Sequence, residues 1–177
     1  MKILSVMIGC GRLLSGVAMF LALSFSTHGQ KMVEGGAYNL MLKTLLSHNV
    51  PEITVEEAGG SPDSYLFVDS REPKEFKVSH IKGAIPVGYD HLDISTLKNI
   101  PKDQPIVVYC SVGYRSEQVS KKLIEAGFTN VKNLYGGLFE WMNQDLPVVD
   151  DNGPTKKVHI FSKGWGIWCH CDEKVSD

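Results

Sequence analysis

The chain lacks a basic patch, an internal repeat and any low-complexity tract. Its 177 residues carry 18 lysines and arginines against 20 aspartates and glutamates, a formal net charge of −2. Without clustered positive charge there is no support for nucleic-acid binding. A hydrophobic content of 43% and a charged content of 21% are ordinary for a globular protein. We therefore expect one folded domain with extensions, long enough to bury a core.

Acidic residues are missing from the first 29 positions. That segment carries Lys2 and Arg12, then the apolar run 13–25 and then small polar residues, which is the layout of a secretory signal peptide. The run is short for a membrane span, so a retained anchor is the weaker interpretation. Cys10 precedes the run, which argues against a lipid-modified cysteine. The sequence thus predicts a signal peptide over 1–29, cleaved after Gly29, and export to the periplasm or the extracellular space without a membrane anchor.

Cysteine is scarce, with four in the whole chain. Removal of the predicted leader would leave Cys110, Cys169 and Cys171. Cysteines tend to pair in an oxidising compartment, and an odd one is a candidate reactive thiol. The count therefore directs attention to Cys110.

Short apolar runs alternate with amphipathic segments through the middle of the chain. We expect strands at 53–55, 65–68, 84–87, 106–109 and 131–134, and helices at 38–48, 72–78, 94–98, 116–126 and 138–143. This alternation predicts an α/β fold, a mostly parallel central sheet with helices on both faces. The domain would span 50–149, after a helical extension at 30–49 and before an aromatic, cysteine-containing tail at 150–177. A linker or turn at 150–154 would open the tail.

Cys110 follows the strand predicted at 106–109 and precedes the helix predicted at 116–126. Backbone N–H groups at such a turn point inward, and the helix N-terminus adds partial positive charge. These surroundings favour thiolate over thiol, so the sequence predicts a nucleophilic Cys110. The alternative is a small buried side chain at a strand end.

Four stretches, taken together and in order, resemble the single-domain rhodaneses, a family of sulfurtransferases. They are Val68 to Glu72 with Glu75 and Phe76, Phe76 to Ile85, Cys110 to Ser116, and Leu134 to Gly137 with Trp141 and Pro147. The likeness covers roughly residues 50–148. Lys82 stands where the family usually has proline, a difference that affects only a turn.

The resemblance implies a three-layer rhodanese-like domain that works without a metal or organic cofactor. Cys110 would take sulfane sulfur from thiosulfate or from a persulfide or polysulfide donor, hold it as a persulfide, and yield it to a thiol or cyanide acceptor, or to a protein thiol. The loop residues Ser111, Val112, Gly113, Tyr114 and Arg115 would bind the donor and the persulfide. Gly113 would allow the loop its backbone angles, and Arg115 would supply positive charge suited to a sulfur anion.

Three other interpretations stay open. One is a module that carries persulfide for a protein partner with little turnover. Another is a cysteine phosphatase or arsenate reductase, although those loops hold one more residue than the four between Cys110 and Arg115. The third concerns Arg115 alone, which would then serve only as a structural ion-pair partner.

Two further features carry expectations about structure. Asp69 ends a predicted buried strand, and we expect it to pair with an arginine near the functional edge of the sheet. The run of Cys169, His170 and Cys171 has no second ligand cluster to complete a zinc site. It leaves three alternatives: unremarkable thiols, a small-ring disulfide between the two cysteines, or a tail cysteine that reaches Cys110.

Overall fold

A parallel sheet forms the centre of the fold in the computed structural model, which describes Val33 and residues 35–176. The strand order is β1-β5-β4-β2-β3, and every neighbouring pair is parallel. The strands are β1 (Glu52–Ile53), β2 (Leu66–Asp69), β3 (Ile85–Pro86), β4 (Ile106–Tyr109) and β5 (Val131–Leu134). The α/β fold with a parallel central sheet is therefore confirmed.

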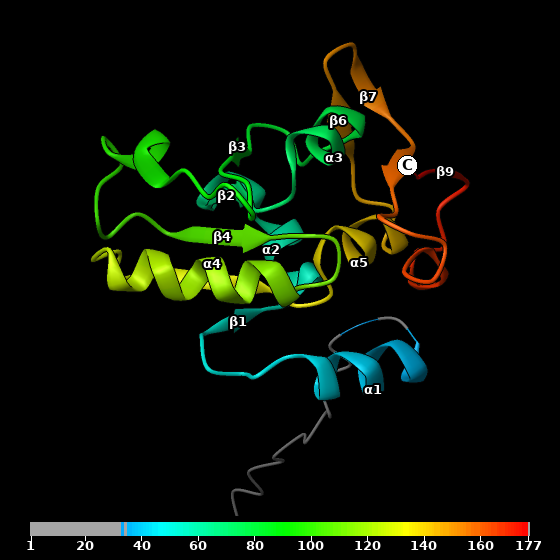
Figure 1. The fold of residues 1–177 in the computed structure, drawn as a ribbon, viewed down its shortest axis with the longest axis horizontal. Helices are drawn as coiled ribbons and strands as arrows, with labels where there is room; N and C mark the ends of the chain where they lie inside the picture. The colour runs from blue at the N-terminus through cyan, green and yellow to red at the C-terminus, as the bar shows by residue number, and fades with distance from the viewer. Residues whose placement is uncertain (1–32, 34, 177) are drawn as a thin grey trace, which may run out of the picture. The chain divides into compact units, whose positions relative to one another are not determined.

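Helices lie on both faces of this sheet (Figure 1). They are α1 (Gly36–Leu45), α2 (Val55–Gly60), α3 (Pro73–Val78), α4 (Tyr114–Glu125) and α5 (Gly137–Asn143). Short 3₁₀ turns occupy Pro62–Ser64, Ile94–Leu97 and Gly166–Trp168. Four of the five helices expected from apolar spacing are present with shifted ends, and the fifth, expected at 94–98, is the 3₁₀ turn Ile94–Leu97.

Strand β4 divides the apolar interior into two clusters. Val107 and Tyr109 belong to the cluster with residues of α1, α2 and α5, whereas Ile106 and Val108 belong to the cluster with residues of α4. Successive side chains of a strand point to opposite faces, so one short strand contributes to both. All four residues are buried, which fixes the end of β4 firmly in the fold.

Helix α2 begins at Val55, where the sequence analysis placed the end of a strand. Thr54 caps it, because its hydroxyl oxygen accepts a hydrogen bond from the Glu57 amide at 3.1 Å. This is the pattern of a serine or threonine followed three residues later by a glutamate. The helix is short and ends in Gly59 and Gly60, which is why its composition resembles a turn.

The chain after α5 folds back onto the domain (Figure 1). β6 (Val148–Asp150) and β7 (Gly153–Thr155) form an antiparallel hairpin where a linker or turn was expected, and β8 (Lys157–His159) pairs in parallel with β9 (Glu173–Val175). Val158, Ile160 and Cys169 are buried in the same cluster as α1 and α5. The tail is therefore part of the packed structure.

The signal peptide predicted over 1–29 lies outside the described residues. Among the residues that are described, none of the helices is long and apolar enough to cross a bilayer.

Candidate active site

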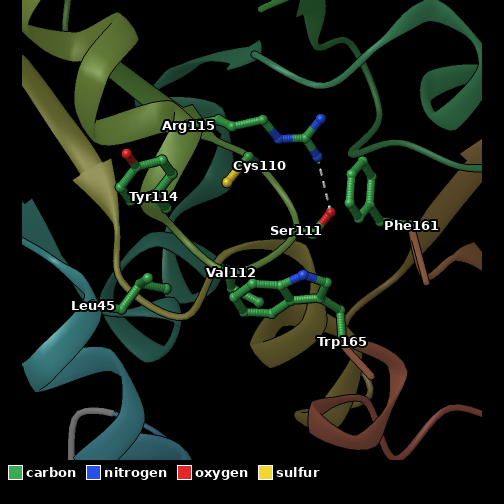
Figure 2. A pocket seen from close by; sticks show the side chains of 8 residues that line it. All are labelled: Leu45, Cys110, Ser111, Val112, Tyr114, Arg115, Phe161 and Trp165. Atoms are coloured by element: carbon green, nitrogen blue, oxygen red, sulfur yellow. Dashed lines mark hydrogen bonds between the residues drawn. The ribbon is translucent and has the colours of Figure 1, made fainter. Parts of the chain in front are cut away.

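A pocket of about 260 Å³ lies at the carboxyl end of β4 (Figure 2). Ligands of open α/β sheets commonly bind in a crevice at this end of the strands. Segments far apart in the sequence line the pocket: Leu45, Cys110, Ser111, Val112, Tyr114, Arg115, Phe161 and Trp165. Of the residues predicted to form the site, the structure brings all but Gly113 to the pocket lining, and Gly113 lies in the same loop.

Cys110 is the residue that follows β4, and only 1% of its surface is exposed to solvent. Its sulfur nevertheless contributes to the pocket lining, among the side chains that Figure 2 labels. The Gly113 N–H donates a hydrogen bond to Cys110 Sγ at 3.1 Å. The thiol is therefore held at the pocket by the backbone of its own loop.

Gly113 precedes helix α4 as its N-terminal cap, with a φ of 117°, an angle that residues with a Cβ rarely adopt. This conformation turns the chain from the loop into the helix. Asn133 of β5 secures the turn, because its side-chain amide donates to the Gly113 carbonyl at 3.1 Å and its oxygen accepts from the Ser116 hydroxyl at 2.7 Å. The sequence carried no signal for Asn133, because its contact comes from a neighbouring strand.

The start of α5 holds the other side of the loop. The Leu138 N–H donates to the Cys110 carbonyl at 2.8 Å, and the Phe139 N–H donates to the Ser111 carbonyl at 3.0 Å. Gly137 permits this approach, because a Cβ there would lie 2.5 Å from the Cys110 carbonyl oxygen. Two helices thus fix the backbone on either side of the thiol.

Arg115 points along the loop toward Ser111 in Figure 2, where the dashed line marks their hydrogen bond. Its guanidinium also forms a two-point ion pair with Glu75 of α3, with both nitrogen–oxygen distances at 2.7 Å. Burial alone would lower the pKa of Arg115, but its hydrogen bonds to the Glu75 carboxylate and the charges of Cys110 and Glu75 raise it overall. The cation expected at the pocket is present, and a carboxylate balances its charge.

Glu75 is another residue at this site whose part the sequence did not reveal. Burial would raise the pKa of its carboxyl group, but Arg115 and the Glu72 backbone N–H outweigh that effect, so the pKa is lowered. Its position at the first turn of α3, behind Pro73, resembles an ordinary helix start. A separation of 40 residues along the chain concealed its pairing with Arg115.

Asp69 pairs with an arginine at the end of β2, as predicted. The Asp69 carboxylate accepts from Arg71 Nη2 at 2.7 Å and from Arg71 Nε at 3.0 Å, and Arg71 Nη2 also donates to the Ser79 carbonyl. Both side chains are fully buried. Burial would lower the pKa of Arg71, and the neighbouring Asp69 carboxylate raises it overall. The pair joins the end of β2 to the residue that follows α3.

Leu45, Phe161 and Trp165 form the remaining wall of the pocket (Figure 2). Leu45 ends α1, whereas the two aromatic residues lie in the segment between β8 and β9. The Phe161 ring lies against the Arg115 guanidinium, with 5.7 Å between the ring centre and Cζ. The aromatic character of the tail is visible in the sequence, but nothing in its spacing indicates that it returns to the loop.

Cys169 and Cys171 form a disulfide with each other, and Cys110 is free. This selects one of the three alternatives left open for the tail cysteines and contradicts a linkage to Cys110. In the described part of the chain, no three or more His, Cys, Asp or Glu side chains are gathered so as to hold a metal ion.

Comparison with known proteins gives a family match over the centre of the chain. A family profile described as a rhodanese-like domain matches residues 54–144. A sulfurtransferase of Allochromatium vinosum is 36% identical over 91 residues, which cover 51% of this chain and 84% of that protein. A tRNA uridine(34) hydroxylase of Hamiltonella defensa is 35% identical over 143 residues, but these cover only 36% of its length.

Solved structures share the fold at lower identity. The rhodanese-like domain of an Anabaena protein superposes with a TM-score of 0.53 at 23% identity, covering 56% of this chain and 79% of that domain. A thiosulfate sulfurtransferase from Pseudomonas aeruginosa gives a TM-score of 0.54 at 19% identity, covering 74% of this chain and 26% of that protein. At these identities the likeness establishes the architecture of the sheet and its helices.

Proposed function

The chain belongs to the rhodanese-like domain family, and we propose that it is a sulfurtransferase that carries sulfane sulfur as a persulfide on Cys110. The family's sulfurtransferase members support the reaction class. The observation that carries the proposal is the position of the Cys110 sulfur, which faces the pocket and accepts a hydrogen bond from the Gly113 N–H at 3.1 Å.

The proposed reaction has two displacements. The Cys110 thiolate attacks the outer sulfur of thiosulfate or of a persulfide, the sulfur–sulfur bond of the donor breaks, and sulfite or a thiolate leaves with the electron pair. An acceptor then attacks the terminal sulfur of the Cys110 persulfide, which restores the thiolate and gives thiocyanate from cyanide or a new persulfide from a thiol. No external oxidant or reductant is consumed, because the sulfane sulfur passes as a neutral atom from one nucleophile to the next. Each departing group keeps the electron pair of the bond that breaks.

Residues around Cys110 have separate parts in this cycle. The Gly113 N–H stabilises negative charge on sulfur, as a backbone donor at a helix start does. The contacts from Leu138 and Phe139 keep the loop backbone in place, so that the donor meets an ordered site. Arg115 orients the Ser111 hydroxyl and remains neutralised by Glu75.

Thiocyanate formation from thiosulfate and cyanide tests the proposal. Purified protein should turn over and, after treatment with donor alone, gain the mass of one sulfur atom, and Cys110→Ser should abolish both. The matched control replaces Cys169 and Cys171 with serine and should keep the activity, provided circular dichroism shows that it is folded. Turnover by Cys110→Ser would overturn the proposal, whereas a persulfide formed without turnover would favour the persulfide-carrying module.

A further inference from the structure

The wall of the pocket opposite Cys110 comes from segments outside the family match. The match spans residues 54–144, whereas Leu45 precedes it and Phe161 and Trp165 follow it. All three side chains are apolar and line the pocket together with the Cys110 thiol (Figure 2). The part of the pocket that would surround the body of a donor is thus built by these flanking segments.

Phe161 is held at the pocket by an unusual backbone conformation. Its φ is 61°, in the left-handed region that bulky side chains rarely occupy. The Phe161 N–H donates to His159 Nδ1 at 3.1 Å, which ties the turn to β8. Phe161 is 52% exposed as a residue, so burial in the core does not account for its position. Strained residues of this kind cluster at functional sites.

The balanced charges that line the pocket disfavour selection of a donor by its negative charge. Among the described residues that line it, Arg115 is the one cation, and Glu75 holds it in a two-point ion pair. A doubly charged inorganic anion would have to enter between Phe161, Trp165 and Leu45 without an unpaired positive charge to replace its water. Transfer of an unpaired charge into such surroundings is costly.

The size of the pocket also exceeds the needs of a small inorganic anion. A cavity of roughly 150 Å³ lined by leucine, isoleucine and phenylalanine accommodates benzene. The pocket at Cys110 has about 260 Å³, enough for a ring of that size together with the reacting group. Apolar walls and this volume fit an organic donor better than thiosulfate.

We propose that Phe161 and Trp165 determine specificity and select sulfane-sulfur donors that carry an apolar organic group. This inference rests on the proposed sulfurtransferase function. The donor class is exemplified by organic thiosulfonates, R–SO₂–S⁻. The Cys110 thiolate attacks the terminal sulfur, the bond between the two sulfurs breaks, and the sulfinate R–SO₂⁻ leaves with the electron pair while R lies against the two rings. Cyanide then removes the sulfur as thiocyanate and restores the thiolate.

The test compares benzenethiosulfonate with methanethiosulfonate, which have the same reacting group and differ in the ring. kcat/KM for thiocyanate formation is measured for each donor and divided by its rate with free cysteine, which corrects for intrinsic reactivity. We expect the corrected ratio of benzene to methane donor to be about tenfold or more, since even one extra methylene group in an apolar pocket contributes a factor of about ten or more. Thiosulfate should be the poorest of the three donors.

Phe161→Ala and Trp165→Ala should each lower that ratio at least about threefold. The matched control is Ile167→Ala, in the same tail, whose side chain is 65% exposed and does not line the pocket; it should keep the wild-type ratio. Trp165 packs against the core, so if Trp165→Ala fails to fold, Phe161→Ala decides. A wild-type ratio near one, or variants that change it no more than the control, would overturn the inference while leaving the sulfurtransferase proposal intact. If Cys110→Ser were as active as the wild type with every donor, both this inference and the sulfurtransferase proposal would be overturned.

Discussion

The pocket is built by two regions: the central residues 54–144 and the flanking segments, which are α1 and the tail after α5. Different interactions hold the two regions in place. Inside the central region the loop is held by polar contacts, such as the Leu138 N–H on the Cys110 carbonyl at 2.8 Å. The flanks meet each other through rings, with Tyr38 stacked on Trp168 at 5.4 Å between centroids, and reach the pocket with apolar side chains. Directional bonds fix the reacting atoms, whereas adaptable apolar surfaces shape the space beside them. Three substitutions test this contrast.

Asp69→Ala should have the largest effect on stability, because it leaves Arg71 buried without its counter-ion. Loss of one partner from a buried pair costs about 3–5 kcal/mol, which lowers Tm by on the order of 10 °C in a chain of this size. Urea unfolding measures the change. The control is Glu57→Gln, which breaks an exposed pair with Lys132 and should cost less than about 1 kcal/mol. If the two variants lost the same free energy of unfolding, the view that buried polar contacts stabilise the central region would be contradicted.

Glu75→Gln should come next and should reveal itself through pH. The fold lowers the pKa of Glu75 below its ordinary 4.5, chiefly through Arg115 acting against the cost of burial. Glu75 therefore contributes its full stabilisation of the fold at pH values above its ordinary pKa. That stabilisation is lost as the pH falls through the lowered pKa of the folded state. Near neutral pH the substitution should cost about 2–3 kcal/mol.

The measurement is the difference in unfolding free energy between wild type and Glu75→Gln across an acid series. That difference should shrink as the pH falls below about 4.5, since the wild-type carboxyl group is then protonated as well. A difference that stays constant down to the acid transition would show that the ion pair does not contribute as described.

Tyr38→Phe should have the smallest effect, and it addresses the junction between the two regions. The Tyr38 hydroxyl on α1 donates to the Gly136 carbonyl at 2.7 Å, just before α5. Its removal should cost about 1 kcal/mol in urea unfolding, the value of a buried hydrogen bond. The control is Tyr65→Phe, whose hydroxyl has no hydrogen bond within the described residues; that change should stay within about 0.5 kcal/mol. If Tyr38→Phe lost more free energy of unfolding than Glu75→Gln, the strongest polar contact would lie in the flanking segment and not in the central region.

The sequence predicted the central region well because its signals are local. The strand at 106–109 lies where it was predicted, and the helix after the loop is present but begins at Tyr114, before its predicted start at Ser116. The pairing of Asp69 with an arginine also follows from the position of a carboxylate at a buried strand end. Local patterns are sufficient where strand, loop and helix are consecutive.

Contacts between distant segments escaped prediction. The pairing of Glu75 with Arg115 and the return of Phe161 to the loop depend on tertiary packing, which short-range spacing does not encode. Of the two possibilities expected at 150–154, a linker or a turn, the structure shows the turn. The sequence did not indicate that the flanking β6 and β7 pair across it as a hairpin. The signal peptide over 1–29 stays a prediction.

The two-point pair between Glu75 and Arg115 has a consequence for how the protein meets its substrates. Opposite charges only a few ångströms apart cancel at longer range, so the pair extends little electric field into the solvent. Dissolved ions have correspondingly little to screen. Association with a donor then depends on diffusive collision and shape, and its rate should vary little with ionic strength.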